Sequence, residues 1–217
     1  MEGGCGQTSH IHHAVRTAYD ICSSLWVFGM FRILLCCVLS LYILPATARD
    51  VDGIAIPDSV TLAGEAQPLV LNGAGYRKKF FIKVYIGALY LAHPTSQAEV
   101  VLDASMPRVM RLHFLRDVAQ DQFTTAWNDG LTPNHTPAEM DALRLRLNHL
   151  NTLIGNLRQK DVLRIEMRPN GQTEVWVNDL QRGIIKGVDF QNALLKAWVG
   201  VKPTDAQLKQ AVLGAKE

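Results

Sequence analysis

Cysteine is missing from most of this chain. The sequence has four cysteines, and all of them precede residue 38. The long remainder therefore has no disulfide, no thiolate metal ligand and no cysteine nucleophile. An excess of charge of one sign is missing as well, because the formal net charge at pH 7 is only +2. Such a mild balance does not indicate nucleic acid or an anionic membrane surface as a partner, and we predict no nucleic-acid binding.

Metal-ligand spacing is also lacking. The histidines after residue 50 are scattered, without a pattern such as H-x-x-x-H; they are His93, His113, His135 and His149. An H-x-H-H motif lies at residues 10–13, where we expect leader sequence rather than folded protein. The sequence therefore predicts no metal site and no cofactor.

Residues 30–48 have the features of an export signal. The positive start Met30-Phe31-Arg32 precedes the apolar run 33–44 and a Pro-Ala-Thr-Ala segment that ends at Ala48. This order is typical of a secretory signal peptide with cleavage after Ala48. The apolar run is too short for a comfortable membrane span. We expect a periplasmic protein with no stable membrane insertion after processing.

Residues 1–29 do not fit this scheme, because a signal peptide rarely begins with so long an extension. We expect them to be non-native or unstructured, with translation starting at Met30. The alternative is a membrane-anchored protein with an uncleaved segment over residues 25–44, although Arg32 interrupts that apolar run. Residues 49–217, about 170 in number, have the size of one domain.

The stretch over residues 69–91 joins a Gly-Ala-Gly segment to basic residues and then to aromatic and β-branched ones. Gly73 and Gly75 predict a corner, through positive φ or a close backbone approach, followed by a long strand. Strand alternation predicts two faces, a core face and an amphipathic face. The core face has Phe80, Ile82, Val84, Ile86, Ala88 and Tyr90, and the amphipathic face has Arg77, Lys79, Phe81, Lys83 and Tyr85. An arginine can hold a carboxylate or enolate oxygen, and a tyrosine hydroxyl can donate to the same oxygen. The competing interpretation is the solvated basic side of an edge strand.

The remaining pattern indicates strands, then helices, a meander and closing helices. Thr136 and Glu139 form a capping box, an Asn-Gly pair at 170–171 indicates a hairpin, and Thr204 is the expected N-cap of the last helix. Grouped helices and hairpin-linked strands predict an α+β fold, an antiparallel sheet with helices on one face. The expected strands cover 51–60 (interrupted at Pro57), 109–115, 162–167, 175–177 and 183–185, and the expected helices cover 95–103, 119–131 (with Gly130 as terminator), 137–154, 189–199 and 204–213.

Several segments carry a family resemblance, in order along the domain: residues 73–79, 81–91, 110–118, 183–190, 194–200 and 202–203. Through them the chain resembles the chalcone isomerase-like family, specifically its exported bacterial branch. The resemblance implies an open-faced β-sandwich, with a large antiparallel sheet, a layer of helices over one face and a cleft between them. It also implies a choice of functions, since the family contains plant enzymes that cyclise chalcones, relatives that bind fatty acids and members without assigned activity.

The resemblance further implies site residues. Arg77 matches the arginine that holds the substrate enolate in the enzymes, and Tyr85 is the nearest match to a hydroxyl residue on the next strand. If these two residues lay on one straight strand, about 26 Å would separate them, so joint action requires a bend or a bulge. The catalytic tyrosine of the enzymes, which follows a glutamine, falls on Phe123 after Gln122, and a phenyl ring cannot donate a hydrogen bond.

Three functions remain open from the sequence. A binding protein would hold a small apolar acidic ligand, such as a fatty acid or an aromatic acid, with Arg77 and Tyr85 at its acidic end. An isomerase of the intramolecular lyase type would use Arg77 to stabilise an enolate. A non-catalytic structural or interaction protein would fill the cleft with its own side chains. Trp127, Trp176 and Trp198 are expected in the core in each case, and the alternative for any one of them is a place in the wall of the cleft.

Overall fold

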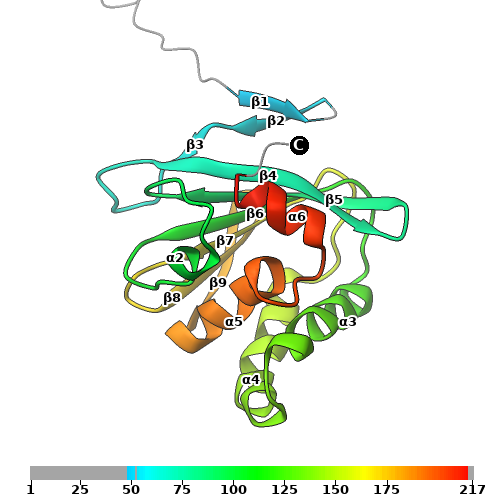
Figure 1. Ribbon diagram of the computed structural model, residues 1–217. Helices are drawn as coiled ribbons and strands as arrows, with labels where there is room; N and C mark the ends of the chain where they lie inside the picture. Colours follow the sequence, from blue (N-terminus) through cyan, green and yellow to red (C-terminus); the bar gives the residue numbers. More distant parts are fainter. Residues whose placement is uncertain (1–47, 52, 215–217) are drawn as a thin grey trace, which may run out of the picture. The chain divides into compact units, whose positions relative to one another are not determined.

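The computed structural model describes residues 48–51 and 53–214 (Figure 1). The predicted extension, the predicted signal peptide up to residue 47 and all four cysteines lie outside these residues. Residues 47–217 form one compact unit, which contains both hydrophobic clusters of the fold. Within the described ranges, no helix is long and apolar enough to cross a membrane.

A seven-stranded antiparallel sheet forms the body of the domain. Its strands follow one another in chain order, so each pairs with its sequence neighbours. The hairpin predicted at residues 170–171 is confirmed, since Gly171, with a φ of 81°, lies between β7 (Val162–Met167) and β8 (Gln172–Val177). A separate hairpin of β1 (Ala48–Val51) and β2 (Ile54–Pro57) precedes the sheet. The sheet consists of β3 (Ser59–Val60), β4 (Leu69–Lys79), β5 (Ile82–Leu91), β6 (Arg108–Phe114), β7 (Val162–Met167), β8 (Gln172–Val177) and β9 (Leu180–Lys186).

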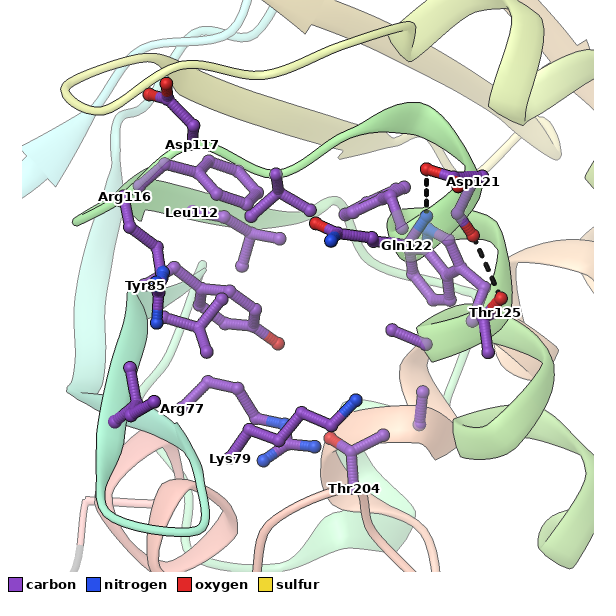
Figure 2. A pocket seen from close by; sticks show the side chains of 18 of the residues that line it. Arg77, Lys79, Tyr85, Leu112, Arg116, Asp117, Asp121, Gln122, Thr125 and Thr204 are labelled. Carbon is purple, nitrogen blue, oxygen red and sulfur yellow. Dashed lines mark hydrogen bonds between the residues drawn. The ribbon is translucent and has the colours of Figure 1, made fainter.

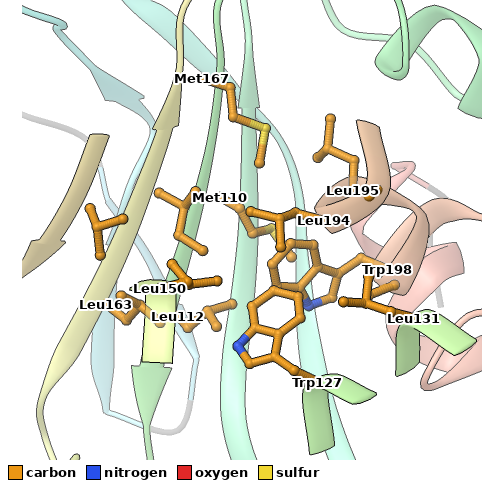
Figure 3. Close-up of a cluster of buried hydrophobic side chains, with 14 of the residues drawn as sticks. Met110, Leu112, Trp127, Leu131, Leu150, Leu163, Met167, Leu194, Leu195 and Trp198 are labelled. Carbon is orange, nitrogen blue, oxygen red and sulfur yellow. The ribbon is translucent and has the colours of Figure 1, made fainter. Parts of the chain in front are cut away.

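Helices cover one face of this sheet (Figure 1). The main hydrophobic core lies between the two layers, where Trp127, Leu194 and Trp198 of the helices pack with Met110 and Leu112 of β6 (Figure 3). This arrangement confirms the predicted α+β class and the open-faced sandwich. The helices are α2 (Ala98–Val101), α3 (Gln120–Leu131), the 3-10 helix η1 (Thr132–Asn134), α4 (Pro137–Ile154), α5 (Val188–Val199) and α6 (Ala206–Val212).

The opposite face of the sheet carries a smaller core. Ile56 of β2 packs there with Ile86 and Tyr90 of β5, and the Tyr90 hydroxyl donates to the Pro57 carbonyl oxygen at 2.9 Å. Ile86 and Tyr90 therefore share an apolar face, as the alternation predicted. The main core, however, lies on the other face of β5, with Tyr85 packed against it.

The three tryptophans expected in the core do not all lie there. Trp127 and Trp198 are buried in the main core. Trp176 is half-buried on the opposite face of β8, where the guanidinium carbon of Arg164 lies 4.7 Å from its ring centroid. The expectation fails at Trp176 because its neighbours Val175 and Val177 point into the main core, and side chains alternate along a strand.

The predicted corner at Gly73-Ala74-Gly75 was wrong. Both glycines lie inside β4, and the chain reverses instead at Phe80 and Phe81, between β4 and β5. The expected core position of Phe80 was therefore wrong, because its side chain lies exposed in the turn. The glycines allow α6 to lie close to β4. A Cβ on Gly73 would collide with the carbonyl oxygen of Ala211, and a Cβ on Gly75 would collide with the Ala211 Cβ. Helix α6 therefore packs directly on the backbone of β4, which a larger residue would prevent.

Of three helix ends predicted from the sequence, one is confirmed and two were wrong. The Thr136 hydroxyl accepts from the backbone N–H of Glu139, which confirms the capping box of α4. Helix α6 begins after Asp205 rather than Thr204, because the Asp205 carboxylate accepts from two backbone N–H groups of the first turn. Gly130 does not end α3; it lies inside the helix, where a Cβ would collide with Thr204.

Candidate functional site

A cavity of about 630 Å³ opens between the turn end of the β4–β5 hairpin, β6 and helices α3 and α5 (Figure 2). Its size falls within the range of about 300–1,000 Å³ typical of small-molecule sites. More than half of its lining side chains are apolar or aromatic. The lining residues are Arg77, Lys79, Phe80, Ile82, Val84, Tyr85, Leu112, Phe114, Arg116, Asp117, Val118, Asp121, Gln122, Phe123, Thr125, Ala126, Trp127, Ala197, Trp198 and Thr204.

Aromatic side chains form a continuous wall of this cavity. Tyr85 contacts Phe114 with ring centroids 5.6 Å apart, and Phe114 contacts Phe123 at 6.2 Å. Phe123 then meets Trp127 edge to face at 5.7 Å, and Trp127 meets Trp198 in the same geometry at 5.1 Å. A hydrogen bond joins the last of these residues to the first, because the Trp198 indole N–H donates to the Tyr85 hydroxyl at 3.0 Å. The polar groups of the wall are thus the hydroxyl of Tyr85, the Trp198 N–H bonded to it, and the buried Trp127 N–H, which has no hydrogen-bond partner among the described residues.

That hydroxyl is positioned as a hydrogen-bond donor. Burial raises the pKa of Tyr85 to about 12, against smaller lowering effects of the Trp198 hydrogen bond and the charge of Arg77. The phenol therefore stays protonated at neutral pH. Its oxygen accepts from Trp198, and among the described residues no protein acceptor takes its own proton. The proton is available to a ligand oxygen in the cavity.

Arg77 lies opposite Tyr85 on the neighbouring strand. Strand register pairs Arg77 directly with Tyr85 across β4 and β5, which puts both side chains on the same face of the hairpin. The guanidinium Nη1 lies 3.7 Å from Asp205 Oδ2 and donates to the carbonyl oxygen of Lys78. The long straight-strand separation considered for the two residues does not apply, because a two-residue turn folds one strand back onto the other.

Further charged residues surround the opening. Lys79 and Arg116 line the cavity on the side of Arg77 and are exposed to solvent (Figure 2). The Asp121 carboxylate on α3 accepts from the backbone N–H of Gln122 at 2.8 Å. Sequence reasoning did not assign Arg116 to the site, although it directly follows the predicted strand that ends at residue 115. It also missed Asp205, which no local pattern connects to Arg77.

Comparison with known proteins shows the family to which the chain belongs. The model of a family described as chalcone isomerase-like matches residues 48–214, so the chain belongs to the chalcone isomerase-like family. No curated protein matches the chain significantly. Among solved structures, the chain resembles a fatty-acid binding protein from Arabidopsis thaliana, with a TM-score of 0.60 and 15% sequence identity over 77% of this chain and 95% of that one. At this identity, the likeness shows a shared fold.

The lining chemistry favours holding an anion over moving a proton. Phe123, which occupies the position matched to the catalytic tyrosine of the enzymes, lies in the aromatic wall and brings no hydroxyl. Among the described lining residues there is no histidine. Within the described part of the chain, no three His, Cys, Asp or Glu side chains are grouped so that they could hold a metal ion. The donors present, Arg77 and Tyr85, are suited to a carboxylate or another oxyanion.

Proposed function

We propose that the domain binds a small ligand with an apolar body and an acidic head, such as a fatty acid or an aromatic acid. The observation that carries this proposal is the pairing of Arg77 with Tyr85 at one side of a largely apolar cavity of about 630 Å³. The apolar body would lie along the aromatic wall, and the acidic oxygens would face the guanidinium and the phenol.

An acidic ligand in an apolar cavity needs charged or polar partners for its carboxylate. A carboxylate that leaves water without a partner costs several kcal/mol or more, so an apolar cavity accepts an acid only beside a cation or strong donors. Asp205 neutralises part of the charge of Arg77, but a guanidinium has five N–H donors and keeps several for a ligand. The Tyr85 phenol adds a neutral donor whose raised pKa keeps its proton in place.

The structural neighbour supports the same class of ligand. That neighbour is a fatty-acid binding protein, and it shares the fold of this chain. The predicted signal peptide at residues 30–48 adds a proposed location, the periplasm, in which such a ligand would be bound. Mass measurement of the exported protein tests that location, because cleavage after Ala48 would leave a chain that starts at Arg49.

The ligand proposal is tested first by native mass spectrometry of the chain from residue 49, purified from its cells. An acidic apolar molecule bound at one per protein is the expected result. Titrations with decanoate and with decanol then compare one apolar chain with and without the acid. Arg77→Ala should weaken decanoate binding about tenfold to a hundredfold, since hydrogen bonds to charged groups contribute about 1.5–3 kcal/mol. It should leave decanol binding within about twofold.

The matched control is Arg144→Ala, which removes an exposed arginine of α4 that pairs with Asp141 at 3.8 Å. Decanoate affinity should be unchanged in that variant. Equal decanoate affinities of wild type and Arg77→Ala would overturn the proposal. Loss of both decanoate and decanol binding would instead indicate a damaged fold, which urea unfolding of the same sample detects.

A further inference from the structure

The turn between β4 and β5 exposes large apolar side chains. Phe80 is 87% exposed, Phe81 is 98% exposed and Ile82 is 50% exposed. These three residues form a projecting tip at the end of the hairpin, which we call the aromatic tip. Two adjacent phenylalanines in water leave about 300–500 Å² of hydrophobic side-chain surface without cover.

The aromatic tip is also an unfavourable turn. Two-residue hairpin turns prefer Asn-Gly or another glycine pair, because their backbone enters the left-handed region. Phe80 occupies that region with a φ of 55°, which bulky side chains rarely adopt. Glycine or asparagine at this position would relieve the strain and remove the exposed ring. Folding therefore does not explain the phenylalanines, and strained residues of this kind concentrate at functional sites.

The hairpin itself carries charge of one sign, whereas Asp205 at the start of the last helix lies 3.7 Å from Arg77, and Asp117 and Asp121 line the same cavity as Lys79. Residues 66–98 contain no aspartate and no glutamate, whereas Arg77, Lys78, Lys79 and Lys83 bring four positive charges to the end of the hairpin. The net charge of the whole chain is +2 and conceals this concentration. The Lys83 ammonium lies 4.0 Å from the centroid of the Tyr76 ring, and Tyr76 pairs with Ile86 farther from the turn, so the side chain of Lys83 points away from the tip. The aromatic tip with Lys78 and Lys79 beside it is suited to an anionic lipid surface. The headgroups of such a surface attract basic residues, and its interface accepts aromatic rings.

We propose that the aromatic tip docks reversibly on an anionic lipid bilayer. Phe80 and Phe81 enter the boundary between headgroups and acyl chains, while Lys78 and Lys79 contact the phosphates. This contact is peripheral and involves only the end of one hairpin.

The docked tip brings the cavity to the membrane surface. Lys79, Phe80 and Ile82 belong to the aromatic tip or its basic flank and also line the cavity. An acyl chain that partitions into the bilayer would thus meet the cavity opening directly. This consequence rests on the proposed function, whereas docking itself does not, because the empty protein carries the same tip.

The test is co-sedimentation of the chain from residue 49 with vesicles of phosphatidylcholine and phosphatidylglycerol. That chain contains the compact unit with both hydrophobic cores, so it is expected to fold alone, and cooperative urea unfolding checks this. Phe81→Ser should lower vesicle affinity about tenfold or more, since one buried phenyl ring is removed from the contact. Phe81 does not line the cavity, so decanoate binding in solution should stay unchanged.

The matched control is Leu145→Ser. Leu145 is 76% exposed on α4 and lies between Arg144 and Arg146, so it is also an apolar side chain beside basic ones. Vesicle affinity should change less than about twofold in that variant. Vesicles of pure phosphatidylcholine should bind the wild type at least about tenfold more weakly than the vesicles that contain phosphatidylglycerol. The reason is that Lys78 and Lys79 lose their anionic partners.

Equal vesicle affinity of wild type and Phe81→Ser would overturn the docking proposal, and so would an absence of binding to the mixed vesicles. Self-association that Phe81→Ser abolishes, seen by size-exclusion chromatography without vesicle binding, would assign the tip to a second copy of the chain instead. The two proposals fail separately. Arg77→Ala tests the ligand in solution, and Phe81→Ser tests the membrane without ligand.

Discussion

Replacement of Tyr85 by phenylalanine isolates one hydrogen bond at the centre of the candidate site. The phenyl ring keeps the packing on Phe114, at a centroid distance of 5.6 Å, while the acceptor of the Trp198 indole N–H disappears. Trp198 is buried, so its N–H is left without a partner in the protein interior. Leaving a buried donor unsatisfied costs about 1–3 kcal/mol.

Urea unfolding and thermal unfolding, both followed by circular dichroism, measure this loss. The thermal midpoint of a domain of this size shifts by about 2–4 °C per kcal/mol, so it should fall by roughly 2–12 °C. Trp198→Phe alone and together with Tyr85→Phe completes a double-mutant cycle, in which the coupling energy should be about 1 kcal/mol. A Tyr85→Phe variant as stable as the wild type, or a coupling energy near zero, would refute the role assigned to this bond.

The same variant changes the pH dependence of stability. Burial raises the pKa of Tyr85 to about 12 in the folded protein, above the ordinary value of 10.0. Below pH 10 the phenol is protonated in both states, and its contribution to stability is complete. Between pH 10 and 12 the unfolded chain releases a proton that the folded protein keeps, so stability falls as pH rises. Tyr85→Phe should make this fall shallower, and Tyr90, also raised to about 12, should leave a remaining slope.

Two further predictions test the fold around the site. Gly75→Ala should destabilise the domain by about 1–3 kcal/mol because its Cβ would collide with Ala211, and urea unfolding should show recovery when Ala211→Gly is added. Burial, with a smaller effect of Arg111, lowers the pKa of His113 to about 4 from 6.5, so the unfolded chain binds a proton first as pH falls. Stability should therefore drop between pH 6.5 and 4, less steeply in His113→Gln than in a His149→Gln control, and equal slopes would contradict this cause.

Much of the fold could be predicted from local patterns. Thr136 and Glu139 marked the start of α4 because a capping box needs only residues three apart. The Asn-Gly pair before β8 marked a hairpin because its backbone preference is local as well. The order of strands and helices then sufficed for the α+β class.

The end of the β4–β5 hairpin could not be found in this way. Gly73 and Gly75 carry the usual signal of a corner, yet they serve contact with α6, which follows about 130 residues later. Phe80 and Phe81 have no turn signal, and the chain reverses there because the pairing of β4 with β5 outweighs the local preference of the two residues.

The sequence by itself determined which chemical groups are available: a permanent cation at Arg77, a phenol at Tyr85 and a bare phenyl ring at Phe123. Their residue types and the alternation of strands are local properties that need no knowledge of the fold. Only the tertiary structure decided that the first two face each other, because the register of the hairpin, not their distance along the chain, brings them together. It also brought Trp198 to the Tyr85 hydroxyl from 113 positions away, since contacts between layers arise from the packing of helices on the sheet.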